Sequence, residues 1–107
     1  MQRMGHVVGI RPESFEEYER IHADVWPEVL AALTAANVHN YSIFRYGELL
    51  FAYWEYTGHD FPADMAAISA DPVSQKWNAL TSQMQRPPEG AAPGVLWLPI
   101  PEVFHLA

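Results

Sequence analysis

The chain of 107 residues contains no cysteine, only six lysine and arginine residues, and no long apolar run. Without cysteine there is no disulfide framework and no thiolate chemistry. Without a run of about eighteen apolar residues, no membrane span is expected. The first residues also lack the basic and apolar pattern of a signal peptide, so a cytoplasmic location is expected.

Basic charge is scarce and scattered along the chain. Thirteen acidic residues outnumber the six basic ones, which gives a formal net charge of −7. No basic stripe is present to follow a phosphate backbone, so the expected partner is a neutral small molecule rather than nucleic acid. Half of the residues are hydrophobic, and together with the length this predicts one globular domain over residues 1–107.

The apolar pattern reads as strand, helix, strand, strand, helix, strand. A first strand is expected over residues 4–10. Two further strands, over residues 40–45 and 48–56, are separated by Tyr46-Gly47, which is a hairpin signal. This order predicts an α+β protein with the ferredoxin-like β-α-β-β-α-β topology.

Four sequence signals mark helix starts. Ser14 and Glu17 form a capping-box pattern at the start of the first helix. Pro27 interrupts the apolar stripe of that helix, so either the helix kinks there or a second helix begins with Pro27 in its first turn. Two further starts are expected at Asp60 and Asp71, each an N-cap acid followed closely by proline.

A last strand is expected over residues 95–106, after a loop rich in proline and glycine over residues 86–94. Pro99 and Pro101 cannot donate hydrogen bonds to a strand ladder. The last strand is therefore expected at a sheet edge or as a crossing arm.

The segment 49–54, Leu-Leu-Phe-Ala-Tyr-Trp, is apolar on both faces. In an antiparallel sheet one face usually meets water, so such a strand needs a cover on each side. Helices can cover one face, and in a chain this short a second copy is expected to cover the other. The sequence therefore predicts a homodimer.

Tyr18 and His22 are four residues apart on the first expected helix, which places them on one face. Histidine can give and take a proton near neutral pH, whereas both residues could also simply pack in the core. Glu19 and His22 form a Glu-x-x-His pair, but di-iron sites need two such pairs and two more carboxylates. The other histidines show no metal-ligand spacing, so no metal site is expected.

Aromatic residues are abundant on the expected strands and on the second helix. Flat apolar faces with polar edges suit a sugar ring. Most of these aromatics are expected in the core or at the dimer interface, and only those whose polar tips lie near His22 are expected to contact a ligand. The aromatics considered are Tyr41, Tyr53, Trp54, Tyr56 and Trp77.

Several strings along nearly the whole chain resemble the L-rhamnose mutarotase family. They are EEYERIHADVWPE over residues 16–28, HNYSIF over 39–44, LLFAYWE over 49–55, DPV over 71–73 with Gln75 and Trp77, and PEVFHL over 101–106. The resemblance implies a dimeric α/β barrel that needs no cofactor. It also implies that the chain is an isomerase acting on a sugar.

The resemblance assigns roles to five residues of this chain. His22 corresponds to the proton donor, and Tyr18 and Tyr41 correspond to residues that contact sugar. The family's consecutive aromatic pair on the second helix aligns with Trp77 and Asn78, so the second tryptophan is replaced by an amide. This departure bears on which deoxysugar fits rather than on the proton chemistry.

The function implied is interconversion of the α and β anomers of L-rhamnose, or of a related deoxysugar, by acid/base ring opening and closure. His22 would act as the acid, Tyr18 would orient the sugar or relay a proton, and no base can be assigned. Two alternatives share the fold: a dimeric-barrel monooxygenase or haem-binding protein, and a non-catalytic barrel that binds small ligands.

Overall fold

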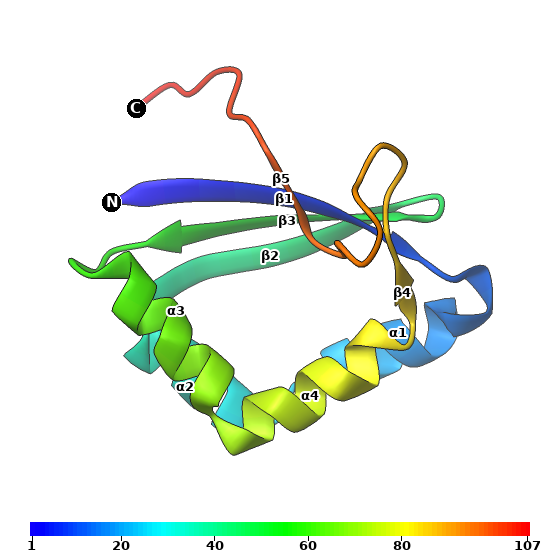
Figure 1. The fold of residues 1–107 in the computed structure, drawn as a ribbon, viewed down its shortest axis with the longest axis horizontal. Coiled ribbons are helices and arrows are strands. Elements are labelled where there is room, and N and C mark those ends of the chain that lie inside the picture. Colours follow the sequence, from blue (N-terminus) through cyan, green and yellow to red (C-terminus); the bar gives the residue numbers. More distant parts are fainter.

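A curled antiparallel sheet with helices on one side makes up the protein, whose computed structural model describes residues 1–107 (Figure 1). The strands are β1 (Gln2–Ile10), β2 (Val38–Tyr46), β3 (Leu49–Tyr56), β4 (Gln85–Arg86) and β5 (Leu98–Ile100). The α-helices are α1 (Phe15–His22), α2 (Pro27–Ala35), α3 (Phe61–Ala70) and α4 (Pro72–Ser82). A short 3₁₀ helix, η1 (Pro12–Ser14), precedes α1.

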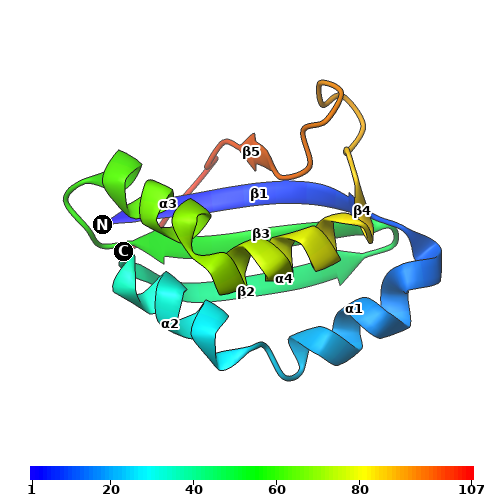
Figure 2. The ribbon, with the colours of Figure 1, turned by 60° about the horizontal axis from the view of Figure 1, so that its bottom comes forward.

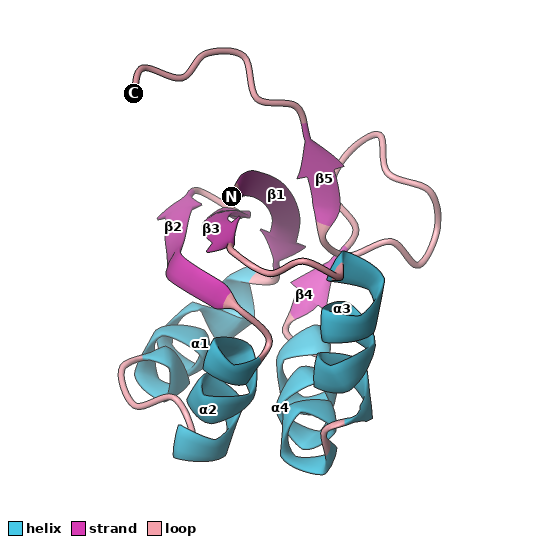
Figure 3. Cartoon of the chain, turned by 90° about the vertical axis from the view of Figure 1, so that its left-hand side faces the viewer, coloured by secondary structure: helices cyan, strands magenta, loops and turns pink.

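The sheet has the strand order β2-β3-β1-β4, and every pairing is antiparallel. β4 and β5 both pair with the edge of β1 that faces away from β3. Helices fill both connections between strands and lie together beneath the sheet (Figures 2 and 3). The predicted α+β, ferredoxin-like fold class is confirmed.

Each predicted helical region is divided into two helices at a proline. α2 begins with Pro27 in its first turn, so the second of the two predictions made for this region is confirmed. Asp60 and Asp71 cap α3 and α4, because each carboxylate accepts a hydrogen bond from the backbone N–H three residues further on. None of the helices has the length and apolar composition needed to cross a membrane.

The predicted capping box at Ser14 is wrong. Ser14 ends η1 with φ −103° and ψ 0°, which is not the extended backbone of an N-cap, and its side chain makes no capping hydrogen bond. Glu17 instead accepts a hydrogen bond from the Nε of Arg20 at 2.9 Å. The 3₁₀ turn before α1 therefore takes over the role that the side-chain cap was expected to fill.

The hairpin β2–β3 turns at Gly47, as predicted, where φ is +57°. A β-bulge lies in β2 between His39 and Ser42, and Asn40 within it has φ +50°. The extra residue reverses the alternation of side chains along β2. Tyr41 consequently faces the helices, where a regular strand would have placed Asn40.

The predicted last strand over residues 95–106 is wrong in extent. Only Leu98–Ile100 pairs with β1, and Gln85–Arg86, which was not predicted as a strand, occupies the next part of the same edge. Pro99 and Pro101 lack the N–H that a longer ladder needs. Residues 101–107 form an exposed tail without secondary structure.

The inner face of the sheet packs on the helices and forms the core. Val8 and Ile10 of β1 are fully buried there, and Leu50 and Tyr56 of β3 are almost fully buried. Tyr18 and Trp77 bring α1 and α4 into the same core.

The outer face of the sheet is apolar but uncovered. Phe44 of β2, Phe51 of β3 and Val7 of β1 lie side by side in the strand register. Phe44 is 65% exposed and Phe51 is 36% exposed. Apolar residues of the tail, among them Val103 and Phe104, are also exposed. One face of the molecule thus carries a broad apolar surface.

Candidate active site

A cavity of about 320 Å³ lies between the inner face of the sheet and helices α1, α2 and α4. We call it the His22 cavity. All five residues to which the sequence assigns a role, Tyr18, His22, Tyr41, Trp77 and Asn78, line it. The remaining lining residues are Val25, Val29, Leu30, Leu33, Ile43, Thr81, Gln85 and Trp97.

His22 ends helix α1, and the backbone of its own helix holds its ring. Its Nδ1 lies 2.7 Å from the carbonyl oxygen of Tyr18, four residues earlier. Because a carbonyl oxygen can only accept, Nδ1 carries the hydrogen. Nε2 is therefore the nitrogen that is free to exchange a proton with a ligand.

His22 is half-buried, and burial lowers its pKa below the usual value for histidine. The hydrogen bond to the carbonyl of Tyr18 acts in the opposite direction but is the smaller of the two effects. At neutral pH the resting ring is therefore neutral, with a lone pair on Nε2. In this state His22 accepts a proton first and can donate one only afterwards.

The Tyr18 ring stacks on the His22 ring, with the two centroids 4.0 Å apart and the planes inclined by 19°. Its hydroxyl accepts a hydrogen bond of 3.2 Å from Nε2 of Gln85, and both side chains are buried. Burial raises the pKa of Tyr18, so the hydroxyl keeps its proton. Because Gln85 donates, that proton remains available for donation to a ligand.

Tyr41 enters the same cavity from the sheet, through the bulge in β2. Burial, and to a smaller extent the nearby Tyr18, raise the pKa of Tyr41 to about 12. The Tyr41 hydroxyl is therefore a permanent hydrogen-bond donor at physiological pH.

Helix α4 supplies Trp77 and Asn78. The Trp77 ring meets His22 and Trp26 edge-on, each with centroids 5.1 Å apart, and Trp77 is buried. Asn78 is more exposed and lies at the rim of the cavity. An aromatic wall with an amide at its edge faces the imidazole.

The structure contains no group of three or more His, Asp or Glu side chains placed to bind a metal ion. Two carboxylates of helix α1 lie near His22 in sequence but are used elsewhere. Glu17 pairs with Arg20, and Glu19 lies 3.8 Å from Arg45. The ionisable groups that line the His22 cavity are the imidazole and the phenols.

Sequence reasoning missed Gln85, Thr81 and Trp97 as lining residues. Trp77, Thr81 and Gln85 follow one another at intervals of four, and this spacing along α4 and just beyond its end was a usable signal. The contact between Gln85 and Tyr18 spans 67 positions, so no local pattern reveals it.

Comparison with known structures places the chain in one fold class. L-rhamnose mutarotase from Formosa agariphila superposes with a TM-score of 0.78 at 21% identity, covering 100% of both chains. Tetracenomycin F2 cyclase from Streptomyces glaucescens superposes with a TM-score of 0.68 at 17% identity, covering 100% of this chain and 97% of the cyclase. At these identities the likeness defines the fold, a ferredoxin-like half-barrel with a cavity beneath its sheet.

Comparison of sequences identifies the family. The family model for L-rhamnose mutarotase matches residues 3–106. A curated L-fucose mutarotase from Xanthomonas campestris is 37% identical and is aligned over 100% of this chain and 90% of its own length. A curated L-rhamnose mutarotase from Oceanobacillus iheyensis is 32% identical over 99% of both chains. The chain belongs to the L-rhamnose mutarotase family, which confirms the predicted resemblance and the enzyme class of sugar isomerase.

Proposed function

We propose that the protein interconverts the α and β anomers of L-rhamnose, or of a related deoxysugar, in the His22 cavity. The observation that carries the proposal is the free Nε2 of a neutral His22, in a cavity with two tyrosine hydroxyls and a tryptophan wall. Aromatic rings suit the C–H face of a pyranose, and hydroxyl groups suit its rim. A net charge of −7 also suits a neutral substrate.

The reaction begins with removal of the proton from the anomeric hydroxyl by Nε2 of His22. The electron pair of that O–H bond forms the C1 carbonyl as the bond between C1 and the ring oxygen breaks. The imidazolium then returns its proton to the ring oxygen. Rotation about C1–C2 and the reverse steps close the ring on the other carbonyl face. A positioned proton transfer contributes about 10²–10⁴-fold.

This sequence of events extends the role predicted for His22. The acid role alone would require an imidazolium at rest, which burial disfavours. A neutral imidazole serves first as base and then as acid, so no separate base is needed. The Tyr18 hydroxyl donates a hydrogen bond to the ring oxygen as negative charge develops there.

Replacement of His22 by alanine tests the proposal. We expect anomer exchange, followed by saturation-transfer NMR on L-rhamnose, to fall by about 10²-fold or more toward the uncatalysed rate. His59→Ala is the matched control, because His59 is exposed and does not line the cavity.

Exchange at the wild-type rate in the His22→Ala protein would exclude His22 as the proton-transfer residue. If that variant only lowered the melting temperature, the non-catalytic barrel would be the better account. A Soret band on addition of haem would support the haem-binding alternative.

L-fucose is a second candidate substrate. The curated relative from Xanthomonas campestris is named L-fucose mutarotase and is 37% identical to this chain. Asn78 stands where the family resemblance expects a second tryptophan, so an extra or differently oriented hydroxyl could be paired there. Exchange rates for L-rhamnose, L-fucose, D-galactose and D-ribose under the same conditions would rank the sugars.

The uncovered outer face supports a homodimer in which two sheets pack face to face. Phe44, Phe51 and Val7 form an apolar row across three strands, and Tyr53 extends the surface. A monomer would leave this surface in water, whereas a two-fold axis would let the same surface cover itself.

The exposed tail over residues 101–107 lies on the side of the sheet opposite the helices (Figures 1 and 3). The ion pair between Arg3 and Glu102, 2.7 Å long, holds the start of the tail. Light scattering at micromolar concentration tests the dimer, and the mass of a monomer would refute it.

The cytoplasmic location and the single domain over residues 1–107 stay predictions. Cell fractionation tests the location. A single cooperative unfolding transition, seen by both calorimetry and circular dichroism, tests the single domain.

A further inference from the structure

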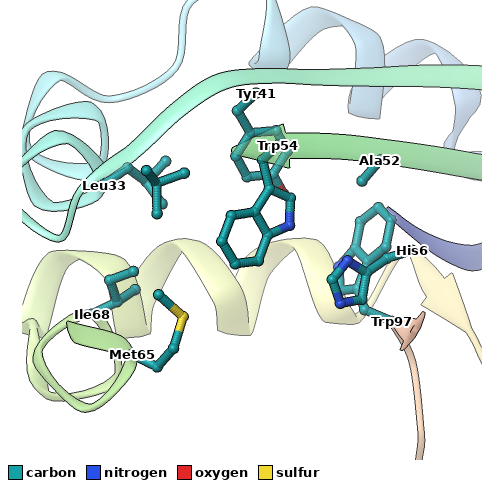
Figure 4. Close-up of a pocket in the computed structure, with 9 residues that line it drawn as sticks. His6, Leu33, Tyr41, Ala52, Trp54, Met65, Ile68 and Trp97 are labelled. Carbon is teal, nitrogen blue, oxygen red and sulfur yellow. The ribbon is translucent and has the colours of Figure 1, made fainter. Parts of the chain in front are cut away.

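A second cavity of about 200 Å³ adjoins the His22 cavity beneath the same sheet. We call it the Trp54 cavity. Its sheet side carries His6, Ala52 and Trp54, and its helix side carries Met65 and Ile68 of α3 (Figure 4). It is a defined space between the sheet and a helix that the proposed proton chemistry does not use.

The two cavities are adjacent. Leu33, Tyr41 and Trp97 line both of them, whereas His22 lines only the first. Figure 4 shows Tyr41 and Trp97 at different borders of the Trp54 cavity. A substituent on a ligand held beside His22 would therefore have to pass these shared residues to reach the Trp54 cavity.

The walls of the Trp54 cavity are almost entirely apolar. The Trp54 ring stacks on His6, with centroids 5.9 Å apart and planes inclined by 5°. The Nδ1 of His6 is buried without a hydrogen-bond partner. Buried polar atoms normally have partners, but this nitrogen has almost no accessible surface, so a ligand in the cavity does not reach it. Burial lowers the pKa of His6, so the ring is neutral.

We propose that the Trp54 cavity is a subsite for a small apolar group attached to the deoxysugar, such as an alkyl ether on one hydroxyl. The alkyl carbons would lie between Trp54, Met65 and Ile68, and the ether oxygen would accept a hydrogen bond from the Tyr41 hydroxyl, which lines both cavities. This inference rests on the proposed function, because it places the sugar ring in the His22 cavity.

Other occupants fit the walls less well. A second sugar ring would bring several hydroxyls into a cavity that offers two polar side chains, and each unpaired hydroxyl would be costly. A carboxylate or phosphate would meet no cation among the lining residues. An alkyl group of a few carbons fits within the volume and matches the polarity.

The position of the alkyl group follows from the geometry of a pyranose. The ring oxygen and C1 must lie at His22, and C3 and C4 are the ring atoms opposite them. Because His22 does not line the Trp54 cavity, the group that enters it should be attached to O3 or O4.

A homologous series tests the subsite on the unaltered protein. Binding of L-rhamnose and of its 3-O- and 4-O-methyl, ethyl and propyl ethers would be measured by isothermal titration calorimetry. For one of the two positions we expect Kd to fall about fourfold for each added carbon. Ethers at both positions that bind no tighter than L-rhamnose would overturn the proposal.

Filling the cavity tests its location. Ile68→Phe should abolish the gain along the ether series while binding of L-rhamnose stays within about twofold. Ala66→Phe is the matched control, because Ala66 lies on the exposed side of the same helix and should leave the series unchanged. A series that keeps its full gain in Ile68→Phe would place the alkyl group elsewhere and contradict the proposal.

Binding of the ethers by calorimetry and anomer exchange by NMR distinguish failure of the subsite from failure of the mutarotase proposal. If the ethers follow the expected series but anomer exchange is not accelerated, the catalytic proposal fails and the subsite stands. If exchange is accelerated but the ethers show no gain, the subsite fails and the catalytic proposal stands.

Discussion

The two faces of the sheet carry similar apolar side chains but differ in what covers them. On the inner face Val8 and Ile10 have no exposed surface, because the helices pack against them. On the outer face Phe44 is 65% exposed, although it lies in the same sheet. Apolar content alone therefore does not distinguish a core from an interface. What distinguishes them is whether another part of the same chain packs on the face. The inner face holds the cavities, and the outer face is free to hold a second copy.

A charge placed in the middle of the outer face should have the largest effect, because it should dissociate the proposed dimer. Phe51 lies between Phe44 and Val7 in the register, so Phe51→Asp would bring an unpaired carboxylate from each copy into the proposed interface. We expect the dimer dissociation constant to rise by about a thousandfold or more. Analytical ultracentrifugation measures this change. Ala67→Asp on the exposed side of α3 adds the same charge and should leave the mass unchanged.

Removal of a buried hydrogen bond on the inner side should have the next largest effect. Gln85→Leu leaves the buried Tyr18 hydroxyl without its donor, which should lower the free energy of unfolding by about 1–3 kcal/mol. If Gln85 positions Tyr18, kcat should fall about tenfold while KM changes less than twofold. In a Tyr18→Phe background the same substitution should have little further effect on kcat. Equal losses of kcat in both backgrounds would assign Gln85 a structural role only.

The pH dependence should reflect the burial of the inner face. Because burial lowers the pKa of His22, the active neutral form should persist below the usual histidine value. We expect kcat/KM to be level near neutral pH and to fall about tenfold per pH unit only below that lowered pKa. An acid limb centred at or above about pH 6.5 would contradict the neutral resting form.

The same shift has a consequence for stability. The unfolded chain binds protons at His6 and His22 more readily than the folded chain does, because both pKa values are lowered by burial. The free energy of unfolding should therefore decrease as pH falls below about 6.5, until the folded histidines are also protonated. Urea unfolding at several pH values measures the slope, which should be smaller in His22→Ala.

The smallest expected effect is at the rim of the inner cavity. Asn78→Trp restores the aromatic pair implied by the family resemblance and should change the ratio of kcat/KM for L-rhamnose and L-fucose about two- to tenfold. Exchange rates for both sugars check this ratio. Asn78→Ala separates loss of the amide from gain of the ring, and an unchanged ratio in both variants would exclude Asn78 from sugar selection.

Features set by neighbours in the chain were predictable from the sequence. The turn at Gly47 and the caps at Asp60 and Asp71 follow from short-range chemistry. The pairing of Tyr18 with His22 on one helix face follows from spacing alone, and their stacked rings agree with it. The failure at Ser14 shows the limit of such signals, because a 3₁₀ turn satisfied the same end of the helix.

Features set by distant segments were not predictable. Two prolines limit the length of the last strand. That Gln85–Arg86 pairs with the part of the β1 edge that β5 leaves free depends on how β1 is placed in the folded sheet. The bulge between His39 and Ser42 decides that Tyr41 faces inward, and Asn40, a residue type that tolerates positive φ, is only a weak signal of it in advance. The Trp54 cavity is built from five separate strands and helices and the loop before β5, so its volume exists only once they pack.

The imidazole of His22 is held by a carbonyl one helical turn away, and that single stretch of chain carries both the reacting group and its support. Most of the side chains that line the cavity and would choose among sugars come from other strands and helices. Evolution or design can therefore exchange the walls one by one while the chemical step survives. Members of a family built this way can change which sugar they accept while the proton transfer stays the same.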